Sequence, residues 1–160
     1  MNELTLRVVA ILIISLVSMT IGQGLKVAIQ SLKNKKNLWR LFFTTGGMPS
    51  SHSATLIAMA TSLCIFQLKF EGRLGYEFAV AVAFTVVVLY DAMGVRYEAG
   101  KHAQILNEIM EHDKEMFDDD NNTELKVLIG HRPLEVLWGI VLGVAVGVVG
   151  ALIYIYAVGK

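Results

Sequence analysis

The chain has 160 residues, as many basic as acidic side chains (14 of each), and a hydrophobic content of 54%. This composition is too apolar for a typical soluble domain, and the length suits a single domain. The zero net charge argues against nucleic acid as a partner. The lone cysteine, Cys64, excludes a disulfide within the chain and a zinc-type cysteine cluster. The class indicated is a polytopic membrane protein.

Four long apolar runs predict membrane-spanning helices. They cover residues 4–22, 54–70, 76–93 and 134–158, approximately. The first run resembles a signal peptide only loosely, because no small-residue cleavage pattern follows it, so we interpret it as a helix. The expected fold is therefore an all-α membrane bundle of about four spans in one domain, 1–160.

The polar region 97–130 separates the third run from the fourth, and apolar residues at roughly helical spacing in its first half predict a helical insertion. The fourth run carries Gly139, Gly143, Gly147 and Gly150, a stripe of small residues that favours close helix packing. The stripe suits packing within the bundle or against a second copy, so a homo-oligomer stays open.

The lysines and arginines are divided unequally between the two sides of the predicted bundle. Ten lie in the long loops 23–53 and 94–133, whereas four lie in the other connections and the termini. The positive-inside rule therefore places both long loops in the cytoplasm. We expect an integral protein of the plasma membrane whose functional side faces the cytoplasm.

The segment 46–53 reads Gly-Gly-Met-Pro-Ser-Ser-His-Ser and comes directly before the second span. Glycines such as Gly47 let a backbone close tightly on a ligand, and amides at the start of a helix bind anions. Ser50 or Ser51 is a candidate cap for this helix. The other candidate reactive residues fall on the same side of the membrane: Lys33, Arg40, His52, Asp91, Arg96, His102, His131 and Glu135.

Basic residues beside an anion loop indicate a phosphate site, and histidines beside it indicate phosphoryl transfer without a metal. A neutral histidine can attack phosphorus, and a protonated one can donate its proton to the leaving alcohol. Both roles suit a group whose ordinary pKa is about 6.5. We therefore expect neither a metal nor another cofactor.

These residues resemble the type 2 phosphatidic acid phosphatase superfamily, which includes vanadium-dependent haloperoxidases, and in particular its small divergent membrane branch. Pro49-Ser50-Ser51-His52 matches the family's PSGH motif, with serine in place of glycine. Lys33 and Arg40 match the KxxxxxxRP motif in part, because Leu41 stands where the family has proline. The resemblance covers residues 33–143.

The family's third motif, SRxxxxxHxxxD, has two possible placements. The compact one takes Arg96 and His102 but finds Leu106 where the acid should be. The split one takes Arg96, then His131 and Glu135 after the insertion, with glutamate in place of aspartate. We prefer the split placement, since Glu135 lies four residues from His131 and one helical turn can bring them together.

The resemblance implies a phosphatase that hydrolyses a lipid phosphomonoester through a phosphohistidine. In this reading His131 is the nucleophile, Glu135 orients it and His52 protonates the leaving group. Lys33, Arg40, Ser50, Ser51 and Arg96 would bind the phosphate, supported by Gly47 and Asp91. A cytoplasmic site favours phosphatidylglycerophosphate as substrate. The alternative is a catalytically lost protein or scaffold that binds lipid phosphates.

Overall fold

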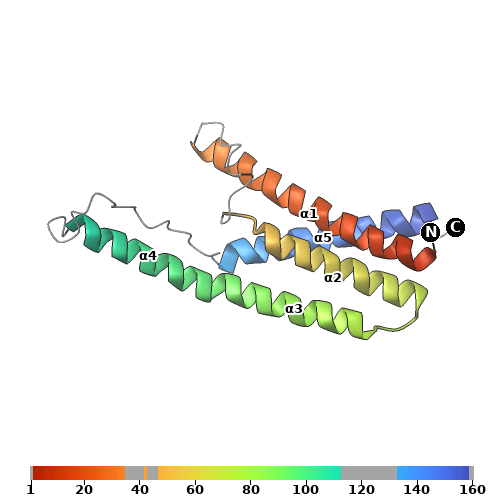
Figure 1. Cartoon of the computed structure of the whole chain (residues 1–160). Helices are drawn as coiled ribbons and strands as arrows, with labels where there is room; N and C mark the ends of the chain where they lie inside the picture. The colour runs from red at the N-terminus through yellow and green to blue at the C-terminus, as the bar shows by residue number, and fades with distance from the viewer. Residues whose placement is uncertain (1, 35–41, 43–46, 113–132, 159–160) are drawn as a thin grey trace.

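The computed structural model describes residues 2–34, 42, 47–112 and 133–158. Apart from short connections these residues form five helices: α1 (Glu3–Asn34), α2 (Ser51–Phe70), α3 (Tyr76–Met93), α4 (Val95–His112) and α5 (Pro133–Val158). Helices α1, α2 and α5 pack against one another, with the most extensive packing between α2 and α5. Helix α3 covers α2 and also contacts α5 (Figure 1).

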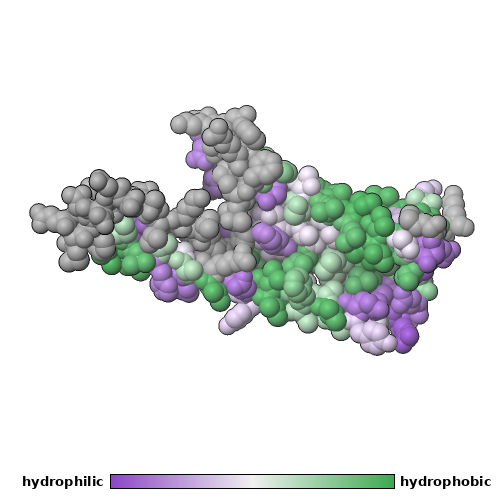
Figure 2. Space-filling model, viewed as in Figure 1, coloured by the Kyte–Doolittle hydropathy of each residue, from purple (hydrophilic) through white to green (hydrophobic). Residues whose placement is uncertain are grey.

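Within the described residues, four helical segments are long and apolar enough to cross a membrane, which confirms the predicted all-α membrane bundle. Figure 2 shows hydrophobic side chains over the middle of the bundle and hydrophilic ones at the end that carries the turn between α2 and α3. Both termini lie at that same end in Figure 1. The segment 47–50, the start of α5 and the end of α3 lie at the opposite end.

Two helices differ from their predicted extents. Helix α1 continues to Asn34, well past the expected end of the first span. Helix α4 begins at Val95 and continues the line of α3, as Figure 1 shows. Around Gly94 the backbone stays bonded, because its N–H donates to Tyr90 O at 2.8 Å and Glu98 N–H donates to Gly94 O at 3.0 Å. The insertion is thus helical from its first residues.

The glycine stripe of α5 forms the seam of the bundle. A Cβ atom at Gly139 or Gly147 would lie 2.8 Å from a side-chain carbon of α2, and one at Gly143 would lie 2.7 Å from Ile57 Cβ. A Cβ at Gly150 would lie 2.7 Å from Ile14 Cγ1 of α1. The stripe therefore serves packing within the bundle, which settles for these four glycines the question that the sequence left open.

Other small side chains on α1, α2 and α5 are also buried between these helices. Ala54, Ala58 and Ala151 are fully buried, and so is Ser18. Ser18 Oγ donates a hydrogen bond to Ala54 O at 2.9 Å, which links α1 to α2 through a backbone carbonyl. Close helix approach at these positions, together with the core around Ile14 and Phe66, thus holds the three central helices together.

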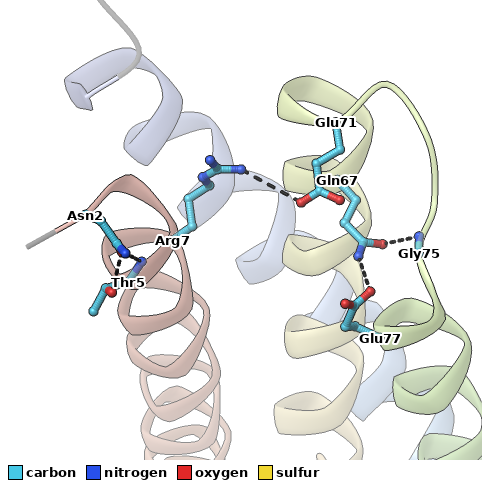
Figure 3. Close-up of polar contacts among 7 residues, drawn as sticks. All are labelled: Asn2, Thr5, Arg7, Gln67, Glu71, Gly75 and Glu77. Atoms are coloured by element: carbon cyan, nitrogen blue, oxygen red, sulfur yellow. Dashed lines mark hydrogen bonds and ion pairs between the residues drawn. The ribbon is translucent and has the colours of Figure 1, made fainter.

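A polar cluster fastens the other end of the bundle (Figure 3). The side chain of Gln67, only 4% exposed, donates to Glu77 Oε2 at 3.0 Å and accepts from Gly75 N–H at 2.9 Å. Arg7 of α1 lies 3.9 Å from Glu71 and above the ring of Phe70. These contacts fix the turn between α2 and α3 and tie it to the start of α1.

Replacing Gly143 with alanine is expected to destabilise the bundle by about 1–3 kcal/mol, because the new methyl group would overlap Ala54 O and Ile57. Gly24→Ala is the matched control, since a Cβ at this helical position meets no atom within 4 Å. Unfolding free energies from SDS titration followed by circular dichroism would compare them. Equal stability of the two variants would contradict the packing role of Gly143.

Candidate functional site

The segment 47–50 leads into α2 through a tight turn. Gly47 has a φ of +89°, a conformation that favours glycine, and the peptide bond between Met48 and Pro49 is cis. Ser50 is the N-cap of α2 and is fully buried. Its Oγ accepts from Ser53 Oγ at 2.9 Å and from Ser53 N–H at 3.4 Å. Ser50 therefore fixes where α2 begins, as the sequence suggested.

Helices α5 and α1 hold this segment from two sides. Ser50 N–H donates to the backbone oxygen of Glu135 at 2.9 Å. A Cβ at Gly139 would lie 2.5 Å from Ser50 O, and one at Gly22 of α1 would lie 3.3 Å from Ser51 Cα. The absence of side chains at these two glycines thus lets both helices touch the start of α2. Residues 47–52, as positioned by these contacts, are called the motif loop below.

Lys26 is the charged residue of α1 that reaches the motif loop. It is 3% exposed, and a Cβ at Gly47 would lie 3.0 Å from its Cδ atom. Its ammonium group is attracted electrostatically by the carboxylate of Glu135. The segment thus combines a buried cation, a carboxylate and the positive end of the α2 dipole.

Lys26 was not predicted as a site residue from the sequence, although its position next to an apolar run was an indication. Lys26 lies on the helix that continues the first apolar run, before the denser basic stretch that contains Lys33. A charge so close to a membrane span is costly unless it is paired or used. Lys33 follows seven residues later on the same face of α1, about two turns farther along the helix, and is exposed.

The structure brings together some of the predicted site residues. Gly47, Ser50, Ser51 and Glu135 meet at the motif loop, and Ser51 is buried there. The side chain of His52, the second residue of α2, is exposed. Glu135 is half-buried in the first turn of α5.

The remaining predicted site residues lie on α3 and α4 or outside the described part of the chain. Asp91 is half-buried near the C-terminal end of α3, and Arg96 lies in the first turn of α4, where its backbone alone is described. His102, from the compact placement, is exposed on α4. Two predicted residues, Arg40 and His131, lie outside the described part of the chain.

Chemically, this arrangement suits an anion with several oxygens. Amides at the start of a helix and a buried ammonium group both stabilise negative charge. The Glu135 carboxylate balances Lys26 when no anion is bound, which reduces the cost of burying the lysine. The segment is therefore a candidate phosphate site.

Comparison with known proteins identifies the family of this chain. The model of the Divergent PAP2 family matches residues 9–146. The uncharacterized membrane protein YuiD of Bacillus subtilis (strain 168) is 34% identical over 143 residues, which cover 83% of this chain and 88% of that protein. No solved structure shows significant similarity. The family match includes the motif loop and its partners on α1 and α5. The chain is an integral membrane protein that belongs to the Divergent PAP2 family.

Proposed function

We propose that the protein is a lipid phosphate phosphatase that hydrolyses a phosphomonoester through a phosphohistidine. The observation that carries the proposal is Lys26, which is buried against Gly47 just before the start of α2. A cation in this place has a ready use as a ligand of phosphate oxygens. Membership of a divergent PAP2 family supports a phosphatase-related activity.

In the proposed reaction a ring nitrogen of His131 attacks phosphorus, and the bond from phosphorus to the lipid oxygen breaks. His52 gives its proton to that oxygen, so the lipid leaves as an alcohol. Water then attacks the phosphohistidine, His52 takes a proton from the water, and inorganic phosphate leaves. Glu135 holds the other nitrogen of His131 in this scheme.

The basic residues of the site balance the charge on the phosphate oxygens. Lys26 joins Lys33, Arg40 and Arg96 in this role, and Asp91 orients Arg96. The amides at the start of α2, preceded by Gly47 and capped by Ser50, complete the cradle together with Ser51. The reaction needs no metal or organic cofactor in this scheme.

We favour phosphatidylglycerophosphate as substrate, because it is a phosphomonoester made on the inner leaflet, where the site is proposed to lie. The second candidate is a protein or scaffold that binds lipid phosphates and no longer hydrolyses them. It is supported by the burial of Lys26, Ser50 and Ser51 at the motif loop, where they could hold an anion without any histidine of the third motif.

Purified protein in detergent is expected to release phosphate from a panel of lipid phosphomonoesters, fastest from phosphatidylglycerophosphate. EDTA should leave the rate unchanged, and vanadate should inhibit, since it adopts the geometry of the transition state. The measurement is colorimetric phosphate release. Strict dependence on magnesium would overturn the metal-free mechanism, whereas binding without any release would favour the second candidate.

The motif loop is expected to face the cytoplasm of a plasma membrane. The uneven division of lysine and arginine supports this orientation, with ten on the proposed cytoplasmic side and four on the other. Single cysteines at positions 119 and 72, in a Cys64→Ser background, would be labelled with a reagent that does not enter intact cells. Labelling at 72 alone is expected, and labelling at 119 alone would reverse the orientation.

A further inference from the structure

Two apolar cavities lie in series along α5. One has a volume of about 440 Å³ and is lined by residues of α1, the motif loop and α5, including Leu25, Met48, Pro49 and Trp138. The other has a volume of about 610 Å³ and lies between α1 and α5 from Ala145 to Val158. Ala145 lines both cavities. Together they form one groove, which begins at the motif loop and continues along the bundle.

The half of the groove nearest the motif loop has the length of a lipid chain, whereas the whole groove, from Trp138 to Val158, covers about 30 Å of helix. Trp138 and Val149 are eleven residues apart on α5, which corresponds to about 16 Å of helix. A hydrocarbon core of about 30 Å gives each leaflet about half of that depth. The stretch from Trp138 to Val149 therefore has the length of one leaflet, counted from the end of the bundle that holds the motif loop.

The groove also borders the motif loop, because Met48 and Pro49 line its first cavity. Pro49 lines the first cavity, and its neighbour Ser50 caps α2. Leu25 lines the same cavity, and its neighbour Lys26 packs against Gly47. Two short stretches of chain thus border the groove and the anion site together. A molecule with an anionic head and an apolar tail matches both surfaces at once.

We propose that this groove is the acyl-chain subsite of the phosphatase, and that one fatty acyl chain of the bound lipid phosphate lies in it between α1 and α5. The proposal rests on the proposed function and names the part of the substrate that the motif loop does not hold. Lipid tails are as apolar as the groove, so the chain gains little from leaving the bilayer. Its role is to position the phosphate for attack.

A second copy of the protein is a less suitable occupant. Close contact between membrane helices relies on small residues, and the glycines of α5 already face α2 and Ile14. Gly150 lines the groove as well, but large exposed side chains such as Val149 and Ile153 lie beside it. Flexible acyl chains adapt to such a surface better than a rigid helix does.

Ala145→Phe is the direct test, because Ala145 is exposed and the added ring would enter the groove rather than the core. Val144→Phe is the matched control, since Val144 is 44% exposed and lines neither cavity. Phosphate release would be measured with dipalmitoyl phosphatidic acid and with its dibutyryl analogue, whose chains are too short to reach Ala145.

Ala145→Phe is expected to reduce kcat/KM for the dipalmitoyl lipid by about tenfold or more, because a misplaced chain misplaces the phosphate. The dibutyryl analogue should be hydrolysed as by the unmodified protein, and Val144→Phe should leave both substrates unaffected. If the protein released phosphate but the two variants had the same kcat/KM for both lipids, the acyl-chain subsite would be overturned, whereas the proposed phosphatase activity would be retained. If Ala145→Phe changed the fraction of dimer but not the preference for the dipalmitoyl over the dibutyryl lipid, the groove would be assigned to a second copy of the protein.

Fluorescence of Trp138 provides a readout that does not need catalysis. With Trp39→Phe as background, Trp138 is the one tryptophan left in the chain. Phosphatidic acid with brominated chains should quench it more than the same mole fraction of brominated phosphatidylcholine, and Ala145→Phe should remove this excess. Stronger quenching by phosphatidic acid in a protein that releases no phosphate would support the acyl-chain subsite and overturn the proposed phosphatase activity. No excess would overturn the subsite.

Discussion

His131→Ala and His52→Ala are each expected to reduce phosphate release by several orders of magnitude, and the double variant should be little worse than either single one. Residues that act as one catalytic unit show this non-additive loss, because removing either partner disables the shared step. Steady-state turnover of a lipid phosphomonoester measures the effect. Each variant must keep the circular dichroism spectrum of the unmodified protein.

His102→Ala is the control within the same protein, since His102 is exposed on α4 and belongs to the compact placement of the third motif. His102→Ala should leave the rate of phosphate release nearly unchanged. Labelled substrate, quenched at alkaline pH to preserve phosphohistidine, would identify the nucleophile by peptide mapping. Label on His102 would show that the split placement is wrong, even though the phosphatase assignment would survive.

Lys26→Met is expected to lower kcat/KM by about 10²–10³-fold, the usual cost of losing one group that stabilises transition-state charge. Methionine keeps much of the aliphatic length that packs on Gly47, and Glu135, which loses the attraction of Lys26, is only half-buried, so the fold should persist. The measurement is kcat/KM for phosphate release, with thermal unfolding in detergent as a check on folding.

Lys33→Met is the matched control, because Lys33 lies on the same face of the same helix but is exposed. We expect a loss smaller than tenfold, in keeping with an outer phosphate contact. If Lys33→Met lowered kcat/KM as much as Lys26→Met or more, Lys33 would be the phosphate-binding lysine of the first motif, as the sequence predicts. Lys26 would then serve only to balance Glu135.

Most of the fold could be predicted from local sequence. The ends of α2, α3 and α5 lie within a few residues of the expected spans, because Gly75, Pro133 and the Ser50 cap mark them. The end of α1 could not be predicted in this way. Hydropathy marks where a helix leaves the membrane, whereas lysines and glutamines are good helix formers and let α1 continue to Asn34.

The candidate site was predictable in its motif but not in its partners. Ser50 and Glu135 were named from sequence, and a backbone hydrogen bond joins them. The contact between Lys26 and Gly47 depends on how α1 crosses the start of α2, which no local pattern encodes. Hydrophobic spacing also could not show that Gly139 and Gly22 enclose the motif loop from two sides, since that requires knowing which helices are neighbours.

The seam between α2 and α5 has a consequence for which substitutions the chain tolerates. Many of its buried positions, such as Ala54, Ala58 and Gly143, already carry the smallest side chains, so truncation can remove little there. Enlargement forces the helix backbones apart. In many soluble proteins the costly core changes are large-to-small, because they leave cavities. At these small seam positions the costly changes are small-to-large instead. Each such position has an upper limit on side-chain volume, and substitutions along α2 and α5 are tolerated there only when the new residue stays under that limit.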